Sequence, residues 1–194
     1  MKPNGRWLPI EGEEYFTVAT PGFVWHAVVR PAPLVWIEAR DRLLSGRGNM
    51  LVKLCSTLTI ADAGGPEIDQ GANLRWLAEA AWFPYAFAGD PIQWEPIDTR
   101  SARVTLLQEG LPVSAIVEVD EEGKLVRLRA DRYRDAGGGR AALTLWTGLY
   151  GDYRDFNGTR VPSSVEVAWD LEEGAFSYAR FQVTALEYNV AARF

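Results

Sequence analysis

Residues 66–82 read PEIDQGANLRWLAEAAW, the one long segment of the chain with a helical repeat of apolar residues. These residues recur at intervals of three and four, at Leu74, Leu77, Ala78, Ala81 and Trp82. Pro66 suits the first turn of a helix, and Glu67 and Asp69 complement the positive end of the helix dipole. The segment therefore predicts an amphipathic helix over about residues 66–83, packed by its apolar stripe against a sheet.

On both sides of this segment, turn signals separate short strand-like runs. Glycine and acidic residues, the usual components of tight turns, are concentrated at residues 45–48, 120–123, 155–158 and 171–174. Between such turns apolar and polar residues alternate, as over residues 113–119, which places one face of a strand on a core. We expect a mainly β (α+β) fold: a curved antiparallel sheet or half-barrel wrapped around one main amphipathic helix, in a single domain spanning residues 1–194.

Charge and composition exclude several classes of protein. The formal net charge is −6 and the pI about 4.9, so the surface repels phosphate backbones and we expect no nucleic-acid partner. Cys55 is the single cysteine, which excludes an internal disulfide. No stretch approaches the roughly 18 apolar residues of a membrane helix, and the first residues lack the apolar run of a signal peptide. The sequence thus predicts no integral membrane segment and a cytoplasmic location.

Common catalytic and metal-binding motifs are missing from the sequence. With one histidine and one cysteine, a zinc site cannot be assembled, and no calcium-loop pattern is present. There is no dinucleotide fingerprint, nucleotide P-loop or nucleophile-elbow sequence. We therefore expect neither a metal nor a cofactor.

Three polar residues in two neighbouring aromatic segments form the candidate catalytic group: His26, Glu38 and Arg40. If the two segments pair through the turn at residues 30–33, the three side chains share one face. A carboxylate beside an imidazole in an apolar pocket can act as an acid/base pair. The alternative is a polar network that satisfies only itself.

A second group of acidic residues lies around the helix. Asp62 can brace the entry to the helix, and Glu67 is explained by the dipole. Glu79 follows Arg75 by four residues, which predicts an ion pair on the helix surface. Their concentration near one helix makes Asp62, Glu67 and Glu79 candidate ligand-binding residues as well.

Tryptophans supply the third set of candidates. The candidate ligand-binding positions are Trp25, Trp36, Trp76, Trp82 and Trp146. Large rings fill a protein core, and in a half-barrel they can equally line a cavity for an apolar ligand. Both roles stay open at this point.

Several of these segments resemble an uncharacterised bacterial family known as a domain of unknown function. The resemblance covers residues 7–189 and is carried by EYFTVATPGFVWHA, RDRLLSGRGNM, DAGGPEIDQGANLRWLAEAAWFP, WEPIDTRSARVTL, DYRDFNGTRVPSSVEVAW and FSYARFQVTALEYN. The family is similar in architecture to lipoprotein carriers of the LolA/LolB type, which implies a half-barrel with helices across its mouth. Members usually have a further N-terminal strand, which implies an open sheet edge in this chain.

The leading hypothesis is that the protein binds an apolar or amphipathic, lipid-like small molecule in the cavity of the half-barrel. The first alternative is a cyclase, isomerase or hydrolase that acts on an apolar substrate in the same cavity. The second alternative is a protein-interaction module that forms a homo-oligomer through an open sheet edge.

Overall fold

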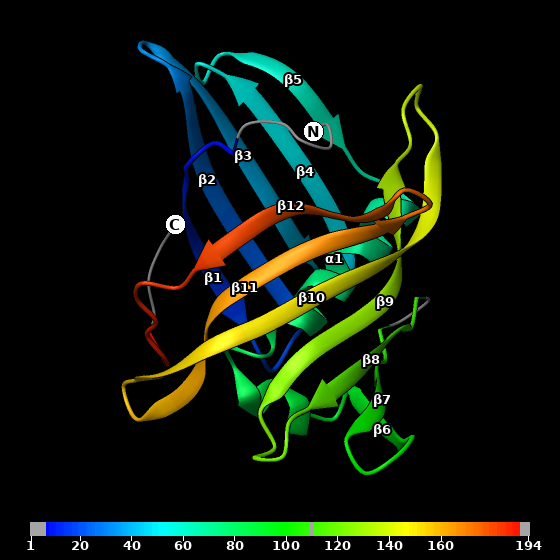
Figure 1. Ribbon diagram of the computed structural model, residues 1–194. Coiled ribbons are helices and arrows are strands. Elements are labelled where there is room, and N and C mark those ends of the chain that lie inside the picture. The colour runs from blue at the N-terminus through cyan, green and yellow to red at the C-terminus, as the bar shows by residue number, and fades with distance from the viewer. Residues whose placement is uncertain (1–6, 109–110, 191–194) are drawn as a thin grey trace.

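The computed structural model describes residues 7–108 and 111–190. It contains two antiparallel sheets with a helix between them (Figure 1). The first sheet comprises β1 (Ile10–Thr17), β2 (Gly22–Ala32), β3 (Val35–Leu44), β4 (Arg47–Leu54) and β5 (Leu58–Ala63). The second comprises β6 (Ile92–Pro96), β7 (Ser101–Leu106), β8 (Val113–Val119), β9 (Leu125–Asp135), β10 (Ala141–Phe156), β11 (Thr159–Leu171) and β12 (Gly174–Gln182). Between the sheets in sequence come the helix α1 (Pro66–Glu79) and the 3-10 helix η1 (Pro84–Ala88).

Each sheet is a meander, because every strand pairs with its neighbour in sequence. The four turns predicted from glycine and acidic residues all lie between paired strands, at β3–β4, β8–β9, β10–β11 and β11–β12. At the β10–β11 turn, Asn157 and Gly158 both have positive φ, 52° and 84°, as tight hairpins require. The mainly antiparallel β fold around one helix is confirmed. The strands form two sheets, with edges at β1 and β5 and at β6 and β12, and the sheets do not close into a barrel.

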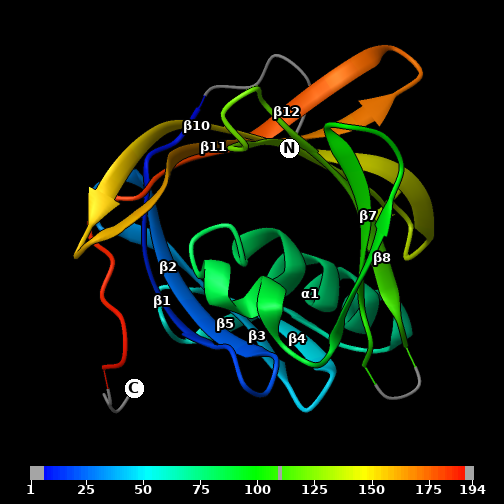
Figure 2. The same cartoon turned by 90° about the horizontal axis from the view of Figure 1, so that it is seen from below.

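The helix α1 is enclosed by both sheets (Figure 2). It packs against β3 and β4 on one side and against β8 and β9 on the other. The four consecutive residues 71–74 are all buried, and at 100° per residue they cover almost the whole circumference of a helix. A single apolar stripe packed on one sheet was therefore the wrong expectation, because the second sheet covers the opposite side of the helix. The helix also ends at Glu79, four residues before the predicted end, and the chain continues through tight turns into η1.

Buried hydrogen bonds connect α1 and the turn after it to both sheets. The Trp76 indole N–H donates to the Thr17 carbonyl at the end of β1, with an N···O distance of 2.9 Å. From the second sheet, the Tyr150 hydroxyl donates to the carbonyl of Ala78 at 3.0 Å. Because an unpaired buried polar group is costly, these bonds fix the height and rotation of the helix between the sheets.

The first turn of α1 lies against the β3–β4 hairpin. The buried Asp69 carboxylate accepts a hydrogen bond from the Gly48 backbone N–H at 2.7 Å, and Arg47 pairs with its other oxygen at 3.0 Å. The helix approaches so closely that a Cβ atom on Gly48 would lie 2.6 Å from the Ile68 carbonyl oxygen and 2.9 Å from the Ala72 Cβ. Gly48 is therefore required by the close contact of strand and helix.

Within the described parts of the chain, no helix combines the length and the apolar character needed to cross a membrane.

Replacing Gly48 with alanine should lower the free energy of unfolding by roughly 1–3 kcal/mol, because the added methyl group forces α1 away from β4. The measurement is urea denaturation followed by tryptophan fluorescence. Gly64→Ala is the matched control, since the nearest atom to a Cβ there is the Gly48 carbonyl oxygen at 3.7 Å. Equal stability of Gly48→Ala and Gly64→Ala would contradict the close packing described here.

Candidate functional site

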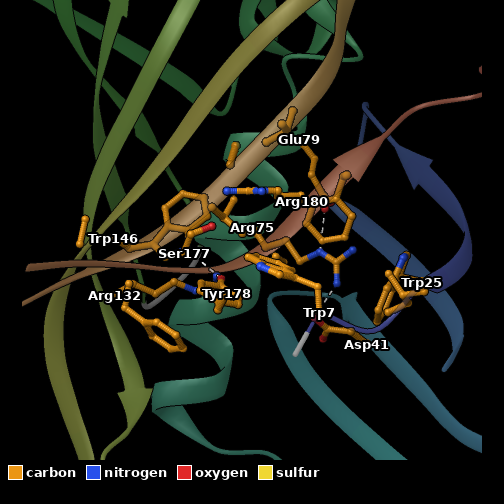
Figure 3. Close-up of a pocket in the computed structure, with 18 of the residues that line it drawn as sticks. Trp7, Trp25, Asp41, Arg75, Glu79, Arg132, Trp146, Ser177, Tyr178 and Arg180 are labelled. Atoms are coloured by element: carbon orange, nitrogen blue, oxygen red, sulfur yellow. Dashed lines mark hydrogen bonds and ion pairs between the residues drawn. The ribbon is translucent and has the colours of Figure 1, made fainter. Parts of the chain in front are cut away.

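A cavity of about 1330 Å³ lies between α1 and the inner faces of the two sheets (Figure 3). This volume is larger than the roughly 300–1,000 Å³ of typical small-molecule pockets. Its wall contains many aromatic side chains, among them Trp7, Trp25, Trp82, Trp146, Tyr178 and Phe181. A few charged side chains are interspersed: Asp41, Arg75, Glu79, Arg132, Glu173 and Arg180. The cavity therefore combines a large apolar surface with a small number of placed charges.

The register of the first sheet places four side chains in one row facing the helix. Glu14 of β1 pairs with Trp25 of β2, Trp25 pairs with Asp41 of β3, and Asp41 pairs with Met50 of β4. The Trp25 ring fits because Gly12 lies beside it: a Cβ on Gly12 would be 2.8 Å from the Trp25 indole nitrogen. Trp25, Asp41 and Met50 all contribute to the cavity wall.

Arg75 of α1 extends from the helix to this row. Its guanidinium group lies 4.7 Å from the centre of the Phe23 ring and 4.8 Å from that of Trp25, in the range of cation–π contacts. It donates to Glu79 at 2.8 Å and to Asp41 at 2.8 Å, and Glu14 lies at 3.5 Å. The ion pair with Glu79 predicted from their spacing is present, but it is buried rather than on the helix surface, with side-chain exposures of 15% and 13%.

Three carboxyl groups around one guanidinium carry an excess of negative charge, which protonation can relieve. Burial and the neighbouring Glu79 raise the pKa of Glu14 well above its ordinary value of 4.5, although Arg75 lowers it. Burial alone lowers the pKa of Arg75, but Glu79, Glu14 and Asp41 more than offset this and raise it. The neighbouring Glu79 carboxyl group also interacts directly with Glu14, which adds to the rise in the pKa of Glu14.

The same cluster contains a buried acceptor atom without a donor in the described parts of the chain. Glu79 Oε2 is shielded from solvent and receives no hydrogen bond from an N–H or hydroxyl donor among the described residues. Glu14 and Glu79 thus form a pair of neighbouring carboxyl groups beside Arg75 in a largely buried position. Within residues 7–108 and 111–190 no group of His, Cys, Asp and Glu is arranged to bind a metal ion.

Four of the residues proposed from the sequence as ligand-binding line this cavity: Trp25, Glu79, Trp82 and Trp146. Trp82 donates its indole N–H to the Pro162 carbonyl at 2.9 Å, and Trp146 donates to the Tyr178 hydroxyl at 2.9 Å. Their polar atoms are thereby satisfied, which leaves the ring surfaces to the cavity.

The other four proposed ligand-binding residues lie elsewhere. Trp76 is fully buried and stacks on Phe16 with 5.3 Å between ring centres, so it is a core residue. Trp36 lies at the β2–β3 turn and donates to Glu38. Asp62 and Glu67 are exposed, and Asp62 accepts a hydrogen bond from Asn49 at 2.9 Å.

The proposed catalytic residues His26, Glu38 and Arg40 do share one face of paired strands. His26 is paired with Arg40, and Glu38 lies two residues away. That face is the outer one, because the alternate residues Trp25 and Asp41 face the cavity. His26 is exposed, Arg40 donates to Asn49 at 2.6 Å, and a hydrogen bond from Ser56 lowers the pKa of Glu38 despite some burial. The structure thus separates these three residues from the cavity.

Glu14, Asp41 and Arg132 are site residues that sequence reasoning missed. Each side chain lies on the inward face of its strand. Glu14 pairs with Trp25, which shares a face with the buried Phe23. Asp41 shares a face of β3 with the buried Leu43, and Arg132 shares a face of β9 with the buried Leu128. A charged residue on the apolar face of a strand is the signal that identifies them, because that face is buried.

The sequence was also compared with known proteins. The model of the Family of unknown function (DUF6544) matches residues 1–181. The chain belongs to this family. No curated protein and no solved structure matches it. The function of this DUF6544 member is therefore inferred from the geometry of its cavity.

Glu14 should make stability fall as pH rises. Because its pKa is raised on folding, the stabilisation is complete below the ordinary value of 4.5 and is lost as pH rises through the folded pKa. Glu14→Gln, which stays neutral, should reduce the loss of unfolding free energy between pH 5 and pH 8. The measurement is urea denaturation at several pH values. Glu11→Gln, an exposed glutamate on the same strand, is the control, and a Glu14→Gln slope equal to that of wild type would contradict the assignment.

Proposed function

We propose that the protein binds an apolar or amphipathic small molecule in the cavity between its two sheets. The observation that carries this proposal is the cavity itself, whose volume of about 1330 Å³ exceeds that of ordinary small-molecule pockets. Aromatic side chains from the first sheet, from the turn after α1 and from the second sheet all contribute to its wall. An apolar molecule of matching size gains free energy by removing this surface from water.

The proposal includes a carrier role like that of the LolA/LolB-type lipoprotein carriers. The support is architectural: curved antiparallel sheets surround a helix and an apolar space. Architecture alone is a weak guide to function, so the binding of a ligand is the property to test first.

A cavity-filling substitution tests the proposal. Val167 of β11 is 6% exposed and lines the cavity, so Val167→Trp should occupy part of its volume. We expect wild type to bind the uncharged fluorophore N-phenyl-1-naphthylamine. Val167→Trp should lower the affinity for this fluorophore by a factor of roughly ten or more. Leu149→Trp is the control, because Leu149 is 42% exposed on the neighbouring strand β10. Failure of wild type to bind, or equal binding by the two variants, would contradict the proposal.

A second candidate function is acid/base catalysis on an apolar substrate in the same cavity. The Glu14–Glu79 pair favours it, because two neighbouring carboxyl groups, of which Glu14 has a raised pKa, lie beside Arg75, and Glu79 lines the cavity. In this reading Glu79 is the base, Glu14 the acid, and Arg75 stabilises negative charge. An enzyme of this kind uses these residues in place of His26, Glu38 and Arg40, which lie on the outer face.

Hydrolysis of 4-nitrophenyl dodecanoate separates this candidate from simple binding. If the pair is catalytic, Glu79→Gln should lower the rate by roughly 100-fold or more, because general acid–base catalysis contributes about that factor. Glu67→Gln, an exposed glutamate of the same helix, should leave the rate unchanged. Absence of turnover, or turnover unaffected by Glu79→Gln, would remove the hydrolase reading.

A further inference from the structure

Arg132 is a charged residue on the apolar inner face of β9. Leu128 and Ala130, which precede it on the same face, are buried core residues. Arg132 itself is half-buried and lines the cavity. The inner face of β9 therefore changes from apolar to cationic at this position.

Among the three arginines that line the cavity, Arg132 differs in its partners. Arg75 is paired with three carboxyl groups, and Arg180 is paired with Glu166 at 2.9 Å. Within residues 7–108 and 111–190, Arg132 has neither a carboxylate partner nor a side-chain hydrogen bond. Its guanidinium group lies 5.4 Å from the centre of the Trp146 ring, on the cavity wall (Figure 3).

The helix α1 fixes the β9 backbone on both sides of Arg132 through Gln70. Strand β8 pairs with β9 as far as Arg129, so the edge of β9 beyond it lacks that neighbour. The Gln70 side chain continues the ladder: its amide N–H donates to the Asp131 carbonyl at 2.7 Å, and its amide oxygen accepts from the Tyr133 N–H at 3.2 Å. Gly71 lies beside the guanidinium group, since a Cβ there would be in van der Waals contact with Arg132 Nε at 3.4 Å.

From these contacts we propose that Arg132 binds the anionic head group of an amphiphile whose apolar chain lies in the cavity. This inference rests on the proposed binding function and adds the charge of the ligand. A guanidinium group presents parallel N–H donors that match the two oxygens of a carboxylate or phosphate. The cation–π contact with Trp146 favours a position of the guanidinium group at the cavity wall, and Gln70 fixes the backbone on both sides of Arg132, which reduces the entropy lost on binding.

Charges elsewhere in the cavity make Arg132 the favoured place for an anion. Arg75 is already surrounded by Glu14, Asp41 and Glu79, so an additional anion there meets like charges. Arg180 is 61% exposed and engaged with Glu166. An anion beside Arg132 meets a cation that has no carboxylate partner in the described parts of the chain, at a partly desolvated wall where such a pair is stronger than in water.

Four probes with one chain length and different head groups test this inference. Dodecanoate, dodecyl phosphate, dodecanol and dodecyltrimethylammonium are each used below the concentration at which micelles form, to displace N-phenyl-1-naphthylamine. We expect wild type to bind at least one of the two anions roughly 10- to 100-fold more tightly than dodecanol, and the cation more weakly than dodecanol. The tighter of the two anions identifies the head group as carboxylate or phosphate.

Arg132→Gln should remove this preference while leaving the affinity for dodecanol unchanged. Arg127→Gln is the matched control, because it removes the same charge from the outer face of the same strand, where Arg127 pairs with Glu118 at 3.0 Å. If dodecanol binds as tightly as both anions in wild type, or if Arg132→Gln keeps the preference, the inference is wrong and apolar binding still stands. If none of the four probes binds, the proposed function fails together with it. The preference of wild type is measured without any variant, so a folding defect in Arg132→Gln leaves the test decisive.

Discussion

The burial of the Arg75 guanidinium group is the constraint on which the arrangement of helix and first sheet depends. A buried charge is costly unless it is paired and hydrogen-bonded, and here the partners come from different elements of the fold. Glu79 belongs to the helix, whereas Asp41 and Glu14 belong to β3 and β1. The helix can therefore adopt only the rotation and height at which Arg75 meets both strands. The same residue brings polar chemistry to the wall of an otherwise largely aromatic cavity.

On its other side α1 is fitted to the second sheet by different means. The Gln70 side chain pairs with the β9 backbone at Asp131 and Tyr133, where β8 no longer does. The Tyr150 hydroxyl donates a hydrogen bond to the carbonyl of Ala78 in the helix. Burial raises the pKa of Tyr150, so this hydroxyl stays a donor. Both interactions use polar groups that need partners once water is excluded. The distance between the sheets, and with it the width of the cavity, is thus set by side chains of the helix and by those that reach it.

Local sequence signals predicted much of the fold. The turn residues placed four hairpins correctly, and Pro66 marked the first residue of α1, because glycine and proline act through backbone geometry that needs no tertiary context. The separation into two sheets and the enclosure of the helix were not predicted. Residues 71–74 are buried on all sides by strands far away in sequence, and no periodic pattern within the helix reveals such neighbours. The residues of the cavity wall were anticipated only in part for the same reason. Trp25 and Trp82 were proposed because they are tryptophans. The positions of Glu14 and Asp41 follow from the register of β1, β2 and β3, which the sequence does not reveal.

The meander order of both sheets has a consequence for how the chain acquires its structure. Every strand pair joins neighbours in sequence, so each sheet can assemble through short-range contacts with a small loss of chain entropy. The helix is the element that contacts both sheets, and its hydrogen bonds span as many as 72 residues, between Tyr150 and Ala78. The packing of both sheets onto α1 is thus where residues distant in sequence meet. The cavity depends on this packing, since its wall is drawn from both sheets.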